Sequence, residues 1–302
     1  MTRGICPSPC RRNSVSPYQG KPIFLKAPAK INWFLQILGK REDGYHDIKS
    51  VMQCISLHDS LTIEPADSID VECDINISVP DNIVYRAASF LKRYCSYGRG
   101  ARILLKKNIP AGAGLGGGSS DAASTILGLN MLWGLGLSVE ELGSISVEIG
   151  SDVPFFLKGQ AALVEGKGEK IRPLKMISSV VLLLVKPRIS VSTAWAYTRF
   201  DQSLNEELTK KPLDIKLFCQ AMNKPDFPSL GKMLHNDFED VVMSRYPAVR
   251  EIKHRLFETG AVITAMSGSG SAVFGVFPGK IEAEKAALAM KPNFCRVVET
   301  IV

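Results

Sequence analysis

Apolar residues recur at helical spacing in several parts of the 302-residue chain. Residues 82–95 and 122–133 place apolar side chains three and four positions apart, which predicts one buried face on each of two helices. A third helix is predicted over 138–149, because Ser138 followed by Glu141 forms a capping box at its start. The carboxyl-terminal part of the chain predicts further helices over 214–222, 228–237, 248–258 and 281–290.

Other segments have the pattern of strands. Residues 55–65 and 69–79 alternate in part between apolar and polar positions, which is typical of half-buried strands. The longest unbroken apolar run, Val180–Val185, is far shorter than the roughly 20 residues that cross a bilayer, so it predicts a buried strand. Further strands are predicted over 101–107, 155–164, 272–277 and 296–302.

The order of these elements indicates the fold class. Near the amino terminus, residues 23–38 predict two strands on either side of a loop at 27–32, followed by a charged turn at 39–46. Later in the chain the pattern changes towards helices, and no internal repeat is visible. We therefore predict an α+β fold with two domains, over residues 21–190 and 191–302.

Composition narrows the class of partner. Hydrophobic residues make up 45% of the chain and charged residues 22%, which describes a soluble globular protein. The net charge of +7 and the isoelectric point near 9.0 favour an acidic partner. The basic residues occur in ones and twos, without the long basic runs or the basic and aromatic alternation of single-strand binders. We therefore expect a compact polyanionic ligand, and neither nucleic acid nor a membrane as partner.

The cysteines and the amino terminus bear on the cell compartment. The seven cysteines are odd in number, widely dispersed and never in Cys-x-x-Cys spacing, which predicts reduced thiols rather than disulfides or a zinc site. Residues 1–20 contain Arg, Ser and Pro but no acidic residue, which faintly resembles an organelle transit peptide. The segment has no amphipathic pattern, so we predict a disordered extension and a cytoplasmic protein.

The most informative stretch is a glycine-rich, chargeless loop between a predicted strand and a predicted helix. Five of the seven residues 112–118 are glycine, which lets the backbone adopt positive φ and brings its amides close to a ligand. Ser119, Ser120 and Asp121 follow and are predicted to supply N-cap oxygens at the start of the helix. Unpaired N–H groups and the helix dipole favour an anion there, so the loop predicts a phosphate site.

Other kinds of glycine-rich loop fit this sequence less well. A Walker P-loop requires a Lys and then Ser or Thr after its second Gly, and this loop contains no Lys. The window 112–117 matches Gly-x-Gly-x-x-Gly, but glycine density nearly forces the match, so a dinucleotide-binding fold ranks second. A flexible surface linker ranks below it, because linkers usually lack the Ser-Ser-Asp sequence and the apolar helix that follow here.

Three segments, 28–32, 110–124 and 266–271, carry a family resemblance. Their order and spacing are similar to those of the GHMP kinase superfamily, whose members phosphorylate small metabolites with ATP. The resemblance implies a two-domain GHMP kinase fold, with a ribosomal protein S5 domain 2-like N-terminal domain and a ferredoxin-like C-terminal domain. Within the superfamily, residues 39–46 and 150–156 resemble the kinases of a cytidine-diphosphate-linked polyol.

The resemblance implies the cofactors and the catalytic pair. ATP would be the phosphoryl donor, and Mg²⁺ is expected with it, because a metal ion neutralises charge between the β- and γ-phosphates. Asp152 matches the family's catalytic aspartate and would take the hydroxyl proton, while Lys30 matches its catalytic lysine and would offset negative charge. The implied ATP-binding residues are Pro110, Ala111, Gly112, Ala113, Gly114, Leu115, Gly116, Gly117, Gly118, Ser119 and Ser120.

The resemblance also implies a substrate pocket. Tyr45 would pack on the cytosine of the substrate and His46 would hydrogen-bond to it, while Tyr197 and Thr193 would supply the other face and a polar contact. Asn32 lies two positions after the catalytic lysine, so in a strand it points to the same side and reaches a substrate oxygen. The second glycine loop would close over the phosphate site, and it adds Gly268 and Ser269 to the substrate-binding residues.

The implied reaction is ATP-dependent phosphorylation of the 2-hydroxyl of this cytidine-diphosphate-linked substrate, in the non-mevalonate route to isoprenoid precursors. Another GHMP kinase, acting on mevalonate or homoserine, is the nearest alternative. A basic nucleic-acid-binding module is an alternative of another class, because the implied amino-terminal fold resembles one found in ribosomal proteins. A dinucleotide-dependent oxidoreductase is the third alternative, and the sequence makes no prediction of the oligomeric state.

Overall fold

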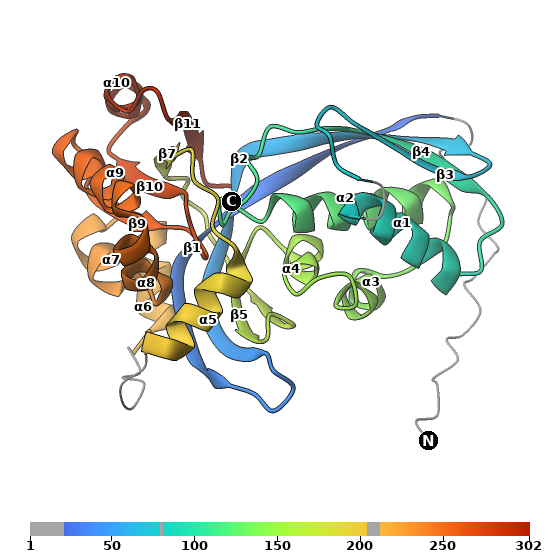
Figure 1. Ribbon diagram of the computed structural model, residues 1–302, viewed down its shortest axis with the longest axis horizontal. Helices are drawn as coiled ribbons and strands as arrows, with labels where there is room; N and C mark the ends of the chain where they lie inside the picture. Colours follow the sequence, from blue (N-terminus) through green and yellow to red (C-terminus); the bar gives the residue numbers. More distant parts are fainter. Residues whose placement is uncertain (1–20, 79–80, 204–211) are drawn as a thin grey trace. The chain divides into compact units, whose positions relative to one another are not determined.

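The structure is a computed structural model that describes residues 21–78, 81–203 and 212–302 (Figure 1). The described chain divides by its contacts into two compact units. The first unit comprises the segments up to Ala27, Asp59–Asn108 and Gly118–Lys158, and the second comprises Pro28–His58, Ile109–Gly117 and Gly159–Val302. The predicted extension at 1–20 lies outside the described residues, and the predicted division into domains near residue 190 stays a prediction.

In the first unit a small mixed sheet is covered by helices. Strand β4 (Gly100–Lys106) pairs in parallel with β3 (Ile69–Cys73) and antiparallel with the end of β2 (His46–Ala66), where Ile63 lies opposite Ile103. Residues directly opposite each other in an antiparallel pair point to the same face of the sheet, and both isoleucines are fully buried. The sheet therefore presents one apolar face to the helices.

The four helices of the first unit gather on that face (Figure 1). They are α1 (Ile83–Tyr94), α2 (Gly117–Leu132), α3 (Val139–Ser146) and α4 (Val153–Lys158). The predicted capping box of α3 is present: Ser138 Oγ accepts the N–H of Glu141, and the Glu141 carboxylate accepts the N–H of Ser138. The core residues that join the helices to the sheet include Val84, Leu91, Ile126, Leu129 and Ile103.

The second unit contains a four-stranded antiparallel sheet in the order β11 (Phe294–Glu299), β7 (Val181–Lys186), β10 (Val273–Phe277) and β9 (Ile263–Met266). In β7, Leu182 and Leu184 face one apolar cluster, and Leu183 and Val185 face another. Both faces are buried, which explains why this strand is an unbroken apolar run and confirms its prediction.

The remaining elements of the second unit pack around this sheet. The second unit's part of β2 pairs with β5 (Ala161–Gly166), which pairs with β6 (Lys170–Pro173), and β1 (Ile23–Lys40) pairs in parallel with β8 (His235–Asn236). The helices are α5 (Thr193–Ser203), α6 (Ile215–Asn223), α7 (Phe227–Met233), α8 (Phe238–Arg245), α9 (Pro247–Glu258) and α10 (Lys280–Ala289).

The secondary structure predicted over 27–32 and over 155–164 is wrong. The loop predicted at 27–32 is part of one continuous strand, β1, and its side chains, including those of Lys30 and Asn32, are buried instead of turning to solvent. The strand predicted over 155–164 begins as the short helix α4, and β5 starts only at Ala161. A short apolar run of this kind has no period that separates helix from strand, so its burial alone misled the prediction.

Two further expectations concern the described part of the chain. No helix there is long and apolar enough to cross a membrane. Its five cysteines, at positions 54, 73, 95, 219 and 295, form no disulfide. This agrees with the reduced thiols that the spacing predicts.

Candidate active site

The first glycine loop leaves β4 and enters α2. Gly112, Gly114 and Gly116 have φ values of +59°, +73° and +70°, a region that favours glycine and that the sequence predicts for this loop. Helix α2 begins at Gly117, so Ser119, Ser120 and Asp121 lie inside the helix, near its start, and are not N-caps as predicted. The N-cap prediction placed the helix start too late, because it assumed that the glycines belong to the loop alone.

Lys30 is held inside the second unit, on β1. Its side chain is 3% exposed, which excludes an ordinary solvated lysine. Nζ donates hydrogen bonds to Asn32 Oδ1 at 2.6 Å and to the carbonyl oxygen of Gly114 at 2.9 Å. The prediction that Lys30 and Asn32 point to the same side of a strand is confirmed. Asn32 in turn donates to Ser50 Oγ at 2.8 Å, so its amide is fixed from both ends.

The second glycine loop joins β9 to β10 and lies against the first. Ser267 Oγ donates to the carbonyl oxygen of Gly114 at 3.0 Å, and the N–H of Ala272 donates to Ala113 at 3.1 Å. A Cβ on Gly114 would lie 2.0 Å from the carbonyl oxygen of Ser267, so only glycine fits there. The three segments that carry the family resemblance therefore meet around one carbonyl group in the second unit.

Asn236, on β8, supports the second glycine loop and was not singled out by the sequence. Its Nδ2 donates to the carbonyl oxygens of Met266 and Gly268, both at 2.9 Å, and its Oδ1 accepts the N–H of Phe238 at 3.0 Å. The residue was predicted as part of a helix over 228–237. No local signal marks its contact with the second glycine loop, because Met266 and Gly268 lie 30 residues or more further along the chain.

Helix α5 brings together several predicted substrate residues of the second unit. The ring of Tyr197 stacks on His46 with centroids 4.5 Å apart, and Thr193 Oγ1 lies 2.8 Å from Ser269 Oγ. Tyr45 is 55% exposed, and Lys167 Nζ lies 4.7 Å from its ring centroid. The sequence predicted no helix over these residues.

Asp152 lies in the first unit, in the turn before α4. The turn is closed by a hydrogen bond from the N–H of Val153 to the carbonyl oxygen of Gly150 at 3.1 Å. The side chain is half-buried, and the bend predicted around it is present, although a helix and not a strand follows.

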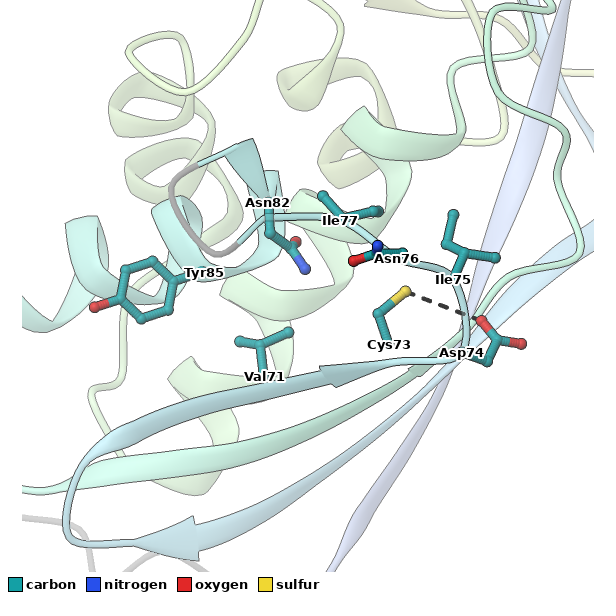
Figure 2. Close-up of a pocket in the computed structure, with 8 residues that line it drawn as sticks. All are labelled: Val71, Cys73, Asp74, Ile75, Asn76, Ile77, Asn82 and Tyr85. Atoms are coloured by element: carbon teal, nitrogen blue, oxygen red, sulfur yellow. Dashed lines mark hydrogen bonds between the residues drawn. The ribbon is translucent and has the colours of Figure 1, made fainter.

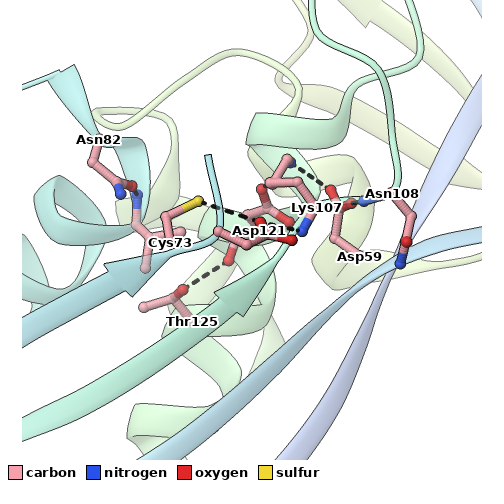
Figure 3. Close-up of polar contacts among 9 residues, drawn as sticks. Asp59, Cys73, Asn82, Lys107, Asn108, Asp121 and Thr125 are labelled. Carbon is pink, nitrogen blue, oxygen red and sulfur yellow. Dashed lines mark hydrogen bonds and ion pairs between the residues drawn. The ribbon is translucent and has the colours of Figure 1, made fainter. Parts of the chain in front are cut away.

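A buried ion cluster holds α2 near its start, through Asp121, in the first unit (Figure 3). Lys107 Nζ donates to Asp59 Oδ2 and to Asp121 Oδ2, both at 2.5 Å. Asp59 Oδ1 also accepts the N–H of Asn108. Both carboxylates are almost fully buried, at 0% and 2% exposure. Two negative groups therefore share one ammonium, and the sequence gave no sign of this arrangement.

The cluster shifts the ionisation of its members. Burial raises the pKa of Asp121 to about 7; the charge of Asp59 adds to the rise, and Lys107 opposes it. Burial lowers the pKa of Lys107, but the two carboxylates outweigh that effect and raise it overall. Asp121 Oδ1 and Ser120 Oγ are buried without a hydrogen-bond partner in the described part of the chain. The amino-terminal part of α2 thus holds two buried oxygen atoms without hydrogen bonds.

A pocket of about 370 Å³ lies between β3 and the start of α1 in the first unit (Figure 2). Val71 and Ile77 give it apolar walls, and the ring of Tyr85 lies at one end. Asn82 Oδ1 caps α1 by accepting the N–H of Val84 at 2.9 Å, and Figure 2 shows its amide group pointing into the pocket. A Cβ on Gly118 would lie 3.6 Å from Ile83, so the first turn of α2 lies close to the first residue of α1.

The comparisons with known proteins agree with this geometry. The model of the GHMP kinases N terminal domain matches residues 82–160, and that of the GHMP kinases C terminal matches residues 217–296. The 4-diphosphocytidyl-2-C-methyl-D-erythritol kinase of Thermodesulfovibrio yellowstonii is 45% identical over 93% of this chain and 98% of its own. The protein of the same name from Geobacter metallireducens is 44% identical over 88% of this chain and 93% of its own.

Solved structures give the same result. A crystal structure of 4-(cytidine 5'-diphospho)-2C-methyl-D-erythritol kinase has a TM-score of 0.80 and 33% identity over 92% of this chain and 99% of that one. Homoserine kinase from Cytophaga hutchinsonii has a TM-score of 0.70 at 17% identity, with 96% of this chain and 98% of that one covered, which shows the fold alone.

The fold and the paired glycine loops define an α+β kinase that phosphorylates a small molecule with ATP. The chain belongs to the GHMP kinase family. The family and the fold class predicted from the three sequence segments are confirmed.

Substitution of Gly114 tests the close approach of the two loops. We expect Gly114→Ala to lower the free energy of unfolding by about 1–3 kcal/mol beyond the penalty for positive φ, because the new Cβ overlaps the carbonyl oxygen of Ser267. ATP-dependent turnover should fall at least tenfold. The matched control is Gly136→Ala, since Gly136 has φ +67° and no atom within 4 Å of a Cβ. Urea unfolding and steady-state kinetics measure both, and equal effects in the two variants would contradict the proposed contact.

The ion cluster makes a prediction about pH. Because the folded pKa of Asp121 lies above the ordinary value of 3.8, its contribution to stability is fully present below about pH 4 and is lost as the pH rises through about 7. Asp121→Asn keeps the shape and removes the ionisation. The free energy of unfolding of the variant, relative to that of the wild type, should therefore be higher at pH 8 than at pH 5 by at least about 1 kcal/mol.

Urea unfolding at several pH values measures this difference. Glu72→Gln is the control, because Glu72 forms an exposed ion pair with Arg102 on the same small sheet and should show a nearly constant difference. A constant difference for Asp121→Asn over the same range would mean that this carboxyl does not titrate near neutrality.

Proposed function

We propose that this protein is a 4-diphosphocytidyl-2-C-methyl-D-erythritol kinase, which transfers the γ-phosphoryl group of ATP to the 2-hydroxyl of that substrate. The reaction belongs to the non-mevalonate route to isoprenoid precursors. The observation that carries the proposal is the meeting of Lys30 and both glycine loops at the Gly114 carbonyl. The identity of 45% with a curated relative of this name supports the choice of substrate. The five cysteines of the described residues form no disulfide and suit the reducing cytoplasm, where we place the enzyme.

The phosphates of ATP bind to the first glycine loop, from Pro110 to Ser120. Its glycines hold positive φ and expose backbone N–H groups, and the amino terminus of α2 adds the positive end of a 16-residue helix. The adenine base occupies the pocket in Figure 2, because that pocket combines apolar walls, the aromatic ring of Tyr85 and the amide nitrogen of Asn82.

Magnesium enters with ATP and neutralises charge on its phosphates. The described part of the chain contains no group of three or more His, Cys, Asp or Glu that holds a metal ion. This fits Mg²⁺, which commonly binds through phosphates and water with one or two protein oxygens. The Ser120 hydroxyl is our candidate protein ligand, since it is an oxygen atom without a partner in the described structure.

The chemistry of the transfer requires little covalent help from the protein. Asp152 accepts the proton of the substrate hydroxyl as the general base, and its turn before α4 holds it in a fixed position. Lys30 offsets the negative charge that develops during transfer, and its buried position keeps Nζ aimed at the glycine loops. Both roles follow from the match to the family's motif.

The substrate binds through residues of the second unit. Tyr45 offers an exposed aromatic face for the cytosine. The next residue, His46, stacks on Tyr197, which lies on α5. The further polar contacts that we assign to the substrate come from Asn32, Thr193, Gly268 and Ser269. The last three are tied together, because Thr193 bonds to Ser269 within the second glycine loop.

A substrate panel tests the function. Purified protein should release ADP with 4-diphosphocytidyl-2-C-methyl-D-erythritol and MgATP at least a thousandfold more efficiently than with mevalonate or homoserine, measured as kcat/KM in a coupled assay. Turnover of mevalonate or homoserine with none of the cytidine compound would assign the chain to the alternative group of GHMP kinases. Tight RNA binding without ATP turnover would overturn both assignments.

Removal of the carboxylate at Asp152 tests its role. We expect Asp152→Asn to lower kcat by about a hundredfold or more while the affinity for ATP stays nearly constant, because loss of a general base acts on the chemical step. Glu148→Gln is a matched control, since Glu148 is an exposed carboxylate four residues earlier. An unchanged kcat in Asp152→Asn would remove Asp152 from this role.

A further inference from the structure

His46 contacts Asp201, a residue that is not among the predicted site residues. Its Nε2 lies 2.7 Å from Asp201 Oδ1, and the other carboxylate oxygen of Asp201 accepts a hydrogen bond from Lys40 Nζ at 3.1 Å. Asp201 lies four positions after Tyr197 on α5, so one helix face supplies both the ring that stacks on His46 and the carboxylate at its edge.

The surroundings fix the His46 ring in one orientation. Tyr197 packs its edge against the buried ring of Phe238, with centroids 4.9 Å apart and planes at 87°. The His46 side chain is only 7% exposed, while that of Asp201 is 26% exposed. Nδ1 of His46 has no hydrogen-bond partner in the described part of the chain. The ring is therefore held through its face by Tyr197 and through Nε2 by Asp201, and Nδ1 remains available for a ligand.

The ionisation of Asp201 decides which ring nitrogen carries the proton. Burial raises the pKa of Asp201, but the hydrogen bonds and charges of His46 and Lys40 outweigh it and hold the pKa below its ordinary value. An ionised carboxylate only accepts hydrogen bonds, so Nε2 of His46 must donate. In the neutral imidazole the other nitrogen, Nδ1, is then an acceptor.

We infer that Asp201 is a positioning residue that makes His46 an acceptor for the 4-amino group of cytosine, and thereby selects a cytidine-linked over a uridine-linked substrate. The inference rests on the proposed function. Cytosine presents an amino donor at the position where uracil presents a carbonyl acceptor. A fixed Nδ1 lone pair attracts the first and repels the second. A pocket with freely exchanging tautomers would accept both bases.

Asp201→Asn is the informative variant because of Lys40. The Lys40 ammonium only donates, so it holds the amide oxygen of the new Asn and turns the NH₂ group towards Nε2 of His46. Nε2 then becomes the acceptor and the ring proton moves to Nδ1. The variant reverses the tautomer with little change in size. Asp201→Glu keeps the carboxylate and serves as the conservative control.

Nitrogen NMR reads the tautomer without any substrate. The chain has four histidines, so a ¹⁵N-histidine sample gives few signals, and loss of one set in His46→Gln assigns His46. Above pH 8 we expect a protonated Nε2 and a bare Nδ1 in the wild type and in Asp201→Glu. In Asp201→Asn we expect the reverse. An unchanged tautomer in Asp201→Asn would overturn the inference.

Steady-state kinetics with the cytidine-linked and the uridine-linked substrate measure the effect of the tautomer on base selectivity. We expect the wild type to prefer the cytidine-diphosphate-linked substrate over its uridine analogue by about a hundredfold or more in kcat/KM, and Asp201→Asn to reduce that preference at least tenfold through KM, with kcat within about threefold. Lys40→Met in the Asp201→Asn background frees the amide to turn its oxygen to His46, so the preference should recover in part.

The outcomes separate the inference from the function. A wild type that does not turn over the cytidine compound contradicts the proposed function, and the NMR result still reports on Asp201. Turnover of the cytidine compound with an equal base preference in wild type and Asp201→Asn contradicts the inference alone. A fall in kcat with an unchanged ratio of the two substrates would show a purely structural role and would also overturn it.

Discussion

The carbonyl oxygen of Gly114 is the point on which the arrangement of the second unit depends. It accepts hydrogen bonds from Lys30 Nζ and from Ser267 Oγ, so three segments far apart in the sequence share one acceptor. A buried ammonium is strongly unfavourable without partners, and here a backbone oxygen and the Asn32 side chain provide them. The glycine at 114 is required by the same contact, because any side chain would displace the second loop.

A second lysine, which is partly buried, likewise holds the chain in place before the glycine loop and near the start of α2. Lys107 directly precedes the loop and joins Asp59 to Asp121 in the first unit. A loop made of glycine has almost no side chains to pack, so its geometry is set by hydrogen bonds at its flanks. One ammonium faces two carboxylates, and burial raises the pKa of Asp121 to about 7.

Local patterns predicted those elements whose signal lies within a few residues. The capping box at Ser138 and the apolar run Val180–Val185 both gave the right element, because a cap and a doubly buried strand depend on adjacent residues. The same reasoning failed for Phe155 and missed α5, the helix that carries Tyr197. Helix α5 has few buried apolar residues, so its helical period is weak and its stability comes from tertiary packing.

The sequence by itself determined the family, the two glycine loops and the position of Lys30 beside Asn32, because these follow from residue identity and from the period of a strand. Only the tertiary structure decided that Lys107 holds two carboxylates, that Asn236 supports the second loop and that Asp201 sets the proton on His46. These contacts join residues up to 155 positions apart. A hydrogen bond is directional over about 3 Å, and no local pattern reports which distant groups the fold brings within that distance.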